Sequence, residues 1–567
     1  MTFSKKYIYI VLLFLFFHLS LYPQQYRSPL DIPHALSANF GELRSNHFHS
    51  GLDFKTQQVI NKPIYAVEDG FISRISVSPG GYGLALYIDH PSTGHTSVYG
   101  HLNSFSKKIT TYVVEKQYEL ESYRIDVQLE PHQIPVSKGE QVALSGNTGS
   151  SGGPHLHFEL RDTRSEDPID PLIFYANSVA DTQKPDLRGI AFYPVAGSGA
   201  VNNSDQPLRL TISKNGQGVP LPIPIPVKAW GKIGMGVKAY DKMNGQANIY
   251  GVKYVRLYVD DEQIFSSIVN RISFDKTRMI NSFVDYEDWR ERKSFFMKSF
   301  VEPGNSLNYY DAINKGYIEI DEERNYNMRY ELEDHHGNIM TYKFVVQGVR
   351  QDISRDTEKC DNFMPWSLYN SYMSQDFILD IPSGNFYSSM CYNHKITQSD
   401  SYFSNIYQVH NNPVPLHNSA KMWIQLRNDT LQNRQQYGIV EITKSGKTAW
   451  VGGDYKNGGI STGIRELGKT YAIEADTTSP IITPVNQASW VSGRKIQIRL
   501  SDDKSGIAHF RGTINGKYVL FSHDMKSSVY TYIFDDSRLE KGQKQQLQFI
   551  ATDGAGNVSE YNYEFTY

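Results

Sequence analysis

The sequence predicts a mainly β protein made of several domains. Its 567 residues exceed the ~250–300 at which a single hydrophobic core stops growing. The chain contains 39 Tyr and 28 Phe, which suit the half-buried surface of a strand. Runs of alternating apolar and polar residues, separated by glycine-containing turns, recur along it. We therefore expect an N-terminal antiparallel β domain with one inserted helix, followed by β-sandwich modules.

The first residues have the pattern of an export signal. Lys5 and Lys6 precede the apolar run YIYIVLLFLFF, and the polar segment SLYPQQ follows. The run is short for a membrane span, which needs ~20 apolar residues. We predict a cleaved signal peptide at residues 1–24, with an uncleaved anchor as the alternative. The protein is then exported, to the periplasm or the cell envelope. Its formal net charge of -3 gives no reason to expect a nucleic-acid partner.

In the N-terminal domain, the strand patterns are PIYAVEDGFISRISVS, LALYIDH and HTSVYGHL, with glycine turns such as PGGYG between them. Short strands at this spacing predict an antiparallel sheet. The segment SKKITTYVVEKQYELESYR has a weak helical period instead. We therefore place the inserted helix between Leu102 and Val136.

Polar, proline-containing phrases divide the rest of the chain. DTQKPDL begins at Asp181 and DTTSPII at Asp476, each ahead of a new strand pattern. A third break is expected in QDISRDTEKCDN, which lacks apolar alternation. These breaks predict domains at residues 25–180, 181–350, 351–475 and 476–567.

The second and fourth of these domains share turn motifs. One contains DKMNG from Asp241 and DHHGN from Asp334, and the other DDKSG from Asp502 and DGAGN from Asp553. Paired turn signals between alternating strands predict immunoglobulin-like β-sandwiches. The segment 351–475 is also β-rich, but its pattern does not define a topology. We expect these modules to serve in spacing or docking, with an envelope protein as a candidate partner.

Two cysteines, Cys360 and Cys391, are present in the whole chain. One pair in so long a chain is no disulfide scaffold, and neither residue lies in a C-x-x-C motif. A structural disulfide and two free thiols therefore remain equal alternatives.

Histidines in three motifs of the N-terminal domain predict a metal site. His49 and Asp53 lie in HSGLD, His101 in YGHL, and His155 and His157 in GPHLHFE. Residues two apart on a strand point to one face, so one histidine of the H-x-H pair is able to bind a metal while the other stands beside it. Two imidazoles and one carboxylate leave a fourth position open, as in catalytic zinc sites.

The same motifs, in this order, resemble the signature of lysostaphin/LytM-type zinc metallopeptidases. The resemblance extends over roughly residues 40–175 and includes the glycine-rich GNTGSSGG. It implies that His49, Asp53 and His157 bind Zn²⁺ and that His101 and His155 are catalytic. It also implies hydrolysis of peptide cross-links or stem peptides of bacterial peptidoglycan. The segment inserted after YGHL departs from the family pattern and leaves substrate selectivity open.

Two other functions are weighed against this peptidase. Some LytM-type domains are catalytically silent regulators of other cell-wall hydrolases, but those have lost ligands that are all present here. Alternatively, the β-modules act as a wall-binding scaffold that carries the peptidase as a passenger.

Several residues close to the motifs receive a structural interpretation. Glu159 lies two residues after His157 and is interpreted as structural, although it is placed to orient a ligand. His47 is interpreted as a neighbour of His49. Three histidines without partner spacing are expected at the surface: His90, His95 and His132.

Overall fold

The predicted fold class is confirmed: in the computed structural model the chain is mainly β, with four successive groups of strands and few helices. The structure describes residues 26–353 and 360–567. The predicted signal peptide lies outside these residues. Within them, no helix is long and apolar enough to cross a membrane.

The N-terminal domain is built on a nine-stranded antiparallel sheet, ordered β1-β4-β13-β8-β7-β6-β10, with β11 beside β6 and β14 beside β13. A three-stranded sheet, β5-β12-β9, and the pair β2-β3 accompany it. The inserted helix is α2, between β9 and β10, where the sequence predicts one. The bounds are β1 Leu36–Ala38, β2 Leu43–Arg44, β3 His47–Phe48, β4 Leu52–Lys55, β5 Pro63–Tyr65, β6 Gly70–Val77, β7 Leu84–His90, β8 His95–Leu102, β9 Ser104–Phe105, α2 Lys107–Glu119, β10 Ile125–Gln128, β11 Pro135–Val136, β12 Gln141–Leu144, β13 His155–Asp162, β14 Pro168–Ile169, α3 Leu172–Tyr175 and η1 Ala176–Ser178.

The second group forms a ten-stranded sheet, ordered β16-β15-β17-β24-β23-β18-β19-β21, with β20 and β22 on β17. Its buried residues continue the core of the N-terminal domain as one hydrophobic cluster. For example, Phe48 packs edge-on against Phe283 and Tyr309. The bounds are β15 Asp186–Val201, β16 Leu208–Thr211, β17 Val227–Tyr240, β18 Tyr254–Val259, β19 Glu262–Ile268, η2 Thr277–Met279, α4 Ile280–Phe283, α5 Tyr286–Arg292, β20 Met297–Lys298, β21 Tyr310–Ala312, η3 Ile313–Gly316, β22 Ile318–Ile320, β23 Asn325–Glu333 and β24 Ile339–Gly348.

The third group is an eight-stranded sheet, ordered β26-β27-β30-β34-β31-β32, with β29 on β30, β33 on β34 and the separate pair β25-β28. A disulfide joins Cys360 to Cys391, which decides between the two alternatives that the sequence leaves open. The bounds are β25 Phe363–Met364, β26 Asn370–Met373, β27 Phe377–Ile381, β28 Met390–Cys391, β29 His394–Thr397, β30 Ile406–Gln425, η4 Arg434–Gln436, β31 Tyr437–Ile442, β32 Thr448–Gly452, β33 Asp454–Lys456 and β34 Gly459–Ala475.

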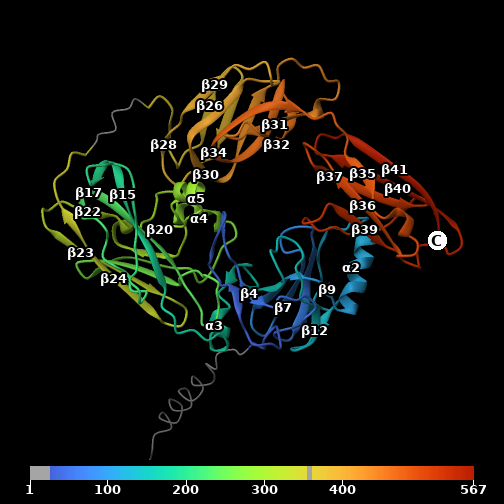
Figure 1. The fold of residues 1–567 in the computed structure, drawn as a ribbon, viewed down its shortest axis with the longest axis horizontal. Helices are drawn as coiled ribbons and strands as arrows, with labels where there is room; N and C mark the ends of the chain where they lie inside the picture. The colour runs from blue at the N-terminus through green and yellow to red at the C-terminus, as the bar shows by residue number, and fades with distance from the viewer. Residues whose placement is uncertain (1–25, 354–359) are drawn as a thin grey trace, which may run out of the picture.

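The fourth group consists of two facing sheets, β35-β36-β39 and β38-β37-β40-β41, around a core of their own. The four groups follow one another around a ring, so that the last lies next to α2 of the first (Figure 1). The bounds are β35 Ile481–Pro484, η5 Gln487–Ser489, β36 Lys495–Ser501, β37 Ile507–Ile514, β38 Lys517–Tyr518, β39 Val529–Ile533, β40 Lys544–Asp553 and β41 Val558–Thr566.

Candidate metal centre

Strands β4 and β13 bring together the residues for which the sequence predicts metal binding. The two strands are antiparallel neighbours, and their register sets His157 directly opposite Asp53. His49 lies just before β4, where Gly51 lets the chain approach β13 closely. A Cβ at Gly51 would lie 2.3 Å from the carbonyl oxygen of Phe158, so no larger residue fits this position.

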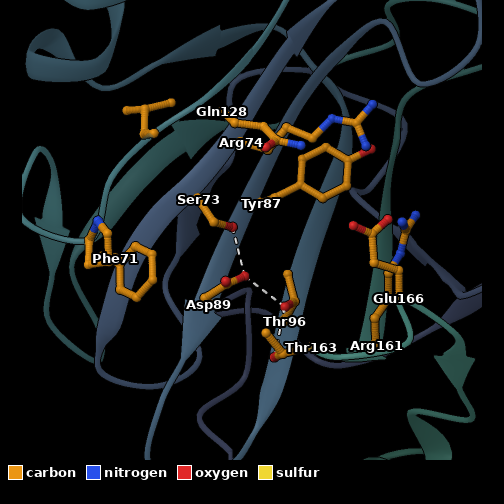
Figure 2. Close-up of a pocket in the computed structure, with 12 residues that line it drawn as sticks. Phe71, Ser73, Arg74, Tyr87, Asp89, Thr96, Gln128, Arg161, Thr163 and Glu166 are labelled. Atoms are coloured by element: carbon orange, nitrogen blue, oxygen red, sulfur yellow. Dashed lines mark hydrogen bonds between the residues drawn. The ribbon is translucent and has the colours of Figure 1, made fainter.

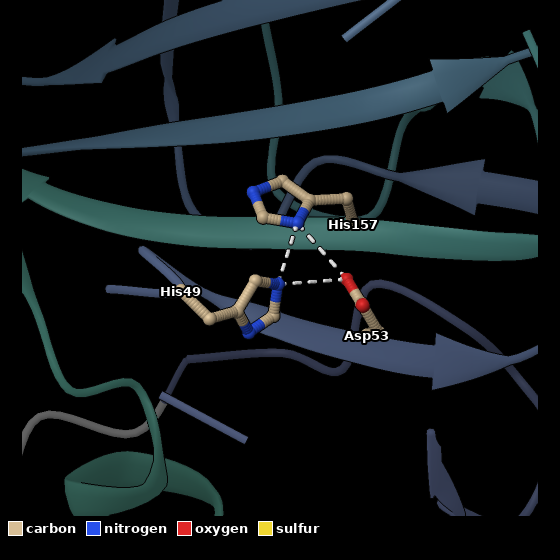
Figure 3. Close-up of side chains that lie close together, drawn as sticks. All are labelled: His49, Asp53 and His157. Carbon is tan, nitrogen blue, oxygen red and sulfur yellow. Dashed lines mark hydrogen bonds and ion pairs between the residues drawn. The ribbon is translucent and has the colours of Figure 1, made fainter. Parts of the chain in front are cut away.

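His49, Asp53 and His157 form a buried cluster of three facing polar atoms (Figure 3). Oδ1 of Asp53 lies 3.1 Å from Nε2 of His49 and 2.9 Å from Nδ1 of His157. The two ring nitrogens are 3.2 Å apart. Each ring is oriented by its other nitrogen: Nδ1 of His49 donates to the carbonyl oxygen of Asn39 at 2.8 Å, and Nε2 of His157 contacts Glu159 Oε1 at 2.8 Å. Such outer hydrogen bonds are typical of metal-binding histidines, and two imidazoles with one carboxylate suit Zn²⁺.

Glu159 has a larger role than the structural one we interpret from sequence. Besides His157, its carboxylate accepts hydrogen bonds from Ser50 Oγ and Tyr82 Oη, both at 2.5 Å, and pairs with Arg161 at 2.6 Å. Burial alone raises the pKa of Glu159, but the charges and hydrogen bonds of Arg161 and His157 hold it well below its usual range. A permanently ionised carboxylate therefore lies behind the His157 ring.

His101 and His155 lie beside the cluster, and each ring bonds a backbone carbonyl through Nδ1. Nδ1 of His101 donates to the carbonyl oxygen of Thr148 at 2.9 Å, and Nδ1 of His155 donates to that of Gly153 at 2.8 Å. Both rings therefore present the lone pair of Nε2. The ring centres are 4.8 Å apart, and Nε2 of His155 is 3.5 Å from Asp53 Oδ1. Burial, with the nearby charges of His157 and His155, lowers the pKa of His101 to about 3, so this ring is neutral at pH 7.

Zinc binding at this cluster is expected to strengthen as pH rises. Burial alone lowers the pKa of His157, but hydrogen bonds to Asp53 and Glu159 and their charges raise it to about 9. A metal ligand must lose this proton, so zinc affinity should rise about tenfold per pH unit between about pH 6 and 8 and level off near 9. Chelator competition at several pH values measures the zinc affinity of this cluster. Zinc that His157→Ala still binds is subtracted as background. A constant affinity over this range would contradict it.

The Glu159→Gln variant is expected to bind zinc about 10–100-fold more weakly, because the His157 ring loses its charged partner. Asp126→Asn is a matched control, since this exposed carboxylate pairs with Arg74 on the same sheet. Its zinc affinity should equal that of the native chain. Equal affinities in both variants would show that Glu159 does not support the metal ligand.

The glycine-rich segment GNTGSSGG includes Thr148, whose carbonyl oxygen bonds to His101. This segment contacts the C-terminal module. Gly149 N donates to Asp524 Oδ2 at 3.0 Å, and Lys526 Nζ donates to the carbonyl oxygens of Asn147 and Gly149 at 2.5 and 2.7 Å. Arg538 also stacks on Tyr118 of α2, at 3.4 Å. No sequence motif predicted these contacts, which join residues 375 or more positions apart.

The remaining histidines are not part of the cluster. His47 is exposed and bonds to the carbonyl oxygen of Ser45, as expected for a mere neighbour. The expectation of a surface position is wrong for His90, which is 0% exposed. Its ring contacts the carbonyl oxygen of Asp69 and the hydroxyl of Ser97. His90 is therefore a core residue whose two ring nitrogens both have hydrogen-bond partners.

A separate cavity of about 310 Å³ opens on the same sheet (Figure 2). Asp89 in its wall accepts hydrogen bonds from Ser73 and Thr96, both at 2.7 Å. Arg161 also lines it, while its guanidinium pairs with Glu159. Because these polar groups already have partners within the protein, the cavity is no rival to the histidine cluster as the reactive centre.

Two segments of the chain match known families. Residues 47–118 match Peptidase family M23, and residues 361–476 match the Zu5-like domain. An uncharacterized metalloprotease of Haemophilus influenzae is 31% identical over 122 residues, which are 21% of this chain and 20% of the relative. The DD-carboxypeptidase/endopeptidase Mpg of Neisseria meningitidis is 31% identical over 130 residues, 23% of each chain. The chain thus spans only about a fifth to a quarter of the length of these relatives. The catalytic domain of lysostaphin from Staphylococcus simulans aligns with 25% of this chain and 92% of its own, at 23% identity and a TM-score of 0.19.

Proposed function

We propose, from the premise that the N-terminal domain is a domain of peptidase family M23, that the chain is a zinc-dependent endopeptidase. Its substrate would be the peptide cross-links or stem peptides of peptidoglycan. The observation that carries the proposal is the buried cluster of His49, Asp53 and His157 with His101 and His155 at its side. The domain division at residues 180, 350 and 475 is part of the same proposal.

Three residues would hold the zinc ion: His49 through Nε2, Asp53 through its carboxylate and His157 through Nδ1. When bound there, zinc supplies a Lewis acid that polarises the substrate carbonyl and lowers the pKa of water to ~7. Asp53 is suited to this because its histidine contacts outweigh burial and hold its pKa well below the usual range. Glu159 and Asn39 keep the two rings in the orientation that the ligands need.

His101 and His155 would move the protons. A neutral ring whose Nδ1–H is held by a backbone carbonyl presents Nε2 as a base. It accepts a proton from the attacking water as the new C–O bond forms, and a ring in the protonated form delivers a proton to the amide nitrogen as the C–N bond breaks. The depressed pKa of His101 keeps its ring neutral at pH 7. We assign the two steps to this pair without dividing them between its members.

A D-alanyl cross-link to diaminopimelate is the bond we propose. The Neisseria relative is called a DD-carboxypeptidase/endopeptidase, which supports a D-alanyl bond over a glycine bridge. An exported enzyme in the periplasm or cell envelope would reach this substrate. The β-modules would then set the distance between enzyme and wall or dock a protein partner.

Mass spectrometry of fragments released from purified peptidoglycan tests this proposal. The native chain should convert cross-linked dimers to monomers with one new amino terminus per bond, while His157→Ala should release none. The exposed His132→Ala serves as a matched control and should behave as the native chain. If the zinc-loaded protein cleaves nothing but stimulates another cell-wall hydrolase, the result would contradict the peptidase and favour the regulator. If His157→Ala still binds cell walls and keeps its biological function, the β-modules would be favoured as a wall-binding scaffold.

A further inference from the structure

The two modules with shared turn motifs place the same acidic residues at the same points of their folds. Asp334 Oδ1 accepts from the backbone N–H groups of His336 and Asn338, at 2.8 and 2.9 Å. In the C-terminal module, Asp553 Oδ1 accepts from Ala555 and Asn557, at 2.9 and 2.8 Å. The turns are therefore equivalent, and His336 stands where the other module has alanine.

In the second module this turn faces Asp181, in the segment that leads out of the N-terminal domain. One oxygen of Asp181, one of Asp334 and a ring nitrogen of His336 all lie within 4.8 Å of one another. Asp181 is 8% exposed and Asp334 1% exposed. The three side chains thus converge at a buried junction between two domains.

The ring of His336 is oriented as in a metal ligand. Its Nε2 donates to the carbonyl oxygen of Val179 at 2.7 Å, which leaves the lone pair on Nδ1. This Nδ1 lies 3.9 Å from Asp181 Oδ2, too far for a hydrogen bond. Within the part of the chain that the structure describes, neither atom has a hydrogen-bond partner. Two buried lone pairs that face each other are costly unless a proton or a metal cation lies between them, and 3.9 Å is too long for a shared proton.

A divalent cation fits this separation. Zinc lies ~2.0–2.2 Å from nitrogen and carboxylate ligands, so two tetrahedral ligand atoms are about 3.4 Å apart. A shift of about half an ångström would bring Nδ1 and Oδ2 to that spacing. The nearby Asp241 is also buried, at 2% exposed, and its Oδ1 has no hydrogen-bond partner among the described residues either.

We propose that Asp181, Asp334 and His336 bind a second divalent cation of the class that takes mixed imidazole and carboxylate ligands, represented by zinc. This site is independent of the proposed peptidase activity. It would tie the segment after the N-terminal domain to the hairpin of β23 and β24. The C-terminal module has a related acidic group, Asp476, Asp502 and Asp553, but no imidazole, because Ala555 replaces His336.

The number of zinc ions retained after dialysis tests the site. The native chain should retain two ions, and His336→Ala and Asp181→Asn one each. Asp334→Asn is avoided, because Asp334 also holds the turn through its backbone contacts. The exposed His509→Ala is the matched control and should retain two. His157→Ala should retain one, and its double variant with His336→Ala none, so a failure of either site is seen separately.

Thermal unfolding provides a readout that a merely structural role would not produce. Added zinc should raise the melting temperature of His157→Ala, because zinc at the second site binds only the folded state. The melting temperature of the double variant, His157→Ala with His336→Ala, should not change. A native chain with a single ion that disappears in His157→Ala would overturn the proposal. Retention of both ions by His336→Ala and by Asp181→Asn would overturn it equally.

Discussion

His157→Ala is expected to lose one zinc ion and at least about 10³-fold in the rate of peptide cleavage. The metal supplies several kcal/mol of transition-state stabilisation, and each 1.36 kcal/mol is tenfold in rate. His157 contributes one of the three facing atoms and is held by Glu159 from behind, so no neighbouring group replaces it. Zinc analysis and initial rates on cross-linked peptidoglycan measure both effects.

His49→Ala and Asp53→Ala should match His157→Ala in both measurements, because all three side chains share one cluster. The control is His47→Ala, an exposed neighbour two residues from His49, which should keep the native zinc content and rate. Native activity in a variant that lacks the zinc ion of this cluster would contradict the assignment of the three ligands.

His101→Ala and His155→Ala should keep the metal and lose turnover. Proton transfer by a positioned histidine contributes about 10²–10⁴-fold, so each variant should be slower by that factor. Their Nδ1 atoms donate to backbone carbonyls, and the two rings lie beside the cluster with their centres 4.8 Å apart. The fall should appear in kcat more than in KM, because these rings act on the proton and not on binding.

Zinc content separates this pair from the ligands. Both catalytic variants should retain zinc as the native chain does, and His101→Gln should be as slow as His101→Ala because an amide does not titrate. Zinc loss equal to that of His157→Ala would mean that the division between ligands and proton carriers is wrong.

The sequence predicted that His49, Asp53 and His157 lie together, as the structure places them, because local spacing determines much of their arrangement. The H-x-H pair on β13 needs only the alternation of a strand to place His155 and His157 on one face, and Gly51 marks the close approach of β4. Residues that depend on distant partners were harder to interpret. Glu159 acquires its role largely from Ser50 and Tyr82, which no spacing rule connects to it, whereas Arg161 lies two residues along the same strand.

Long-range packing accounts for what the sequence could not predict. His90 carries no pattern that distinguishes a surface histidine from one bonded to Asp69 and Ser97 in the core. Contact between the glycine-rich segment and Asp524 requires all four groups of strands to close into a ring. The repeated acidic turns were visible as motifs, but only the fold shows that Asp181 faces His336.

Removal and return of zinc on one preparation of the native chain tests the central claim most directly. Zinc content and the release of new amino termini from peptidoglycan would be followed before chelation, after it and after zinc is added back. The proposed peptidase predicts that cleavage disappears with the metal and returns with it, while His157→Ala stays inactive throughout. Cleavage that continues in the metal-free chain, or its absence from the fully reloaded chain, would contradict a zinc endopeptidase.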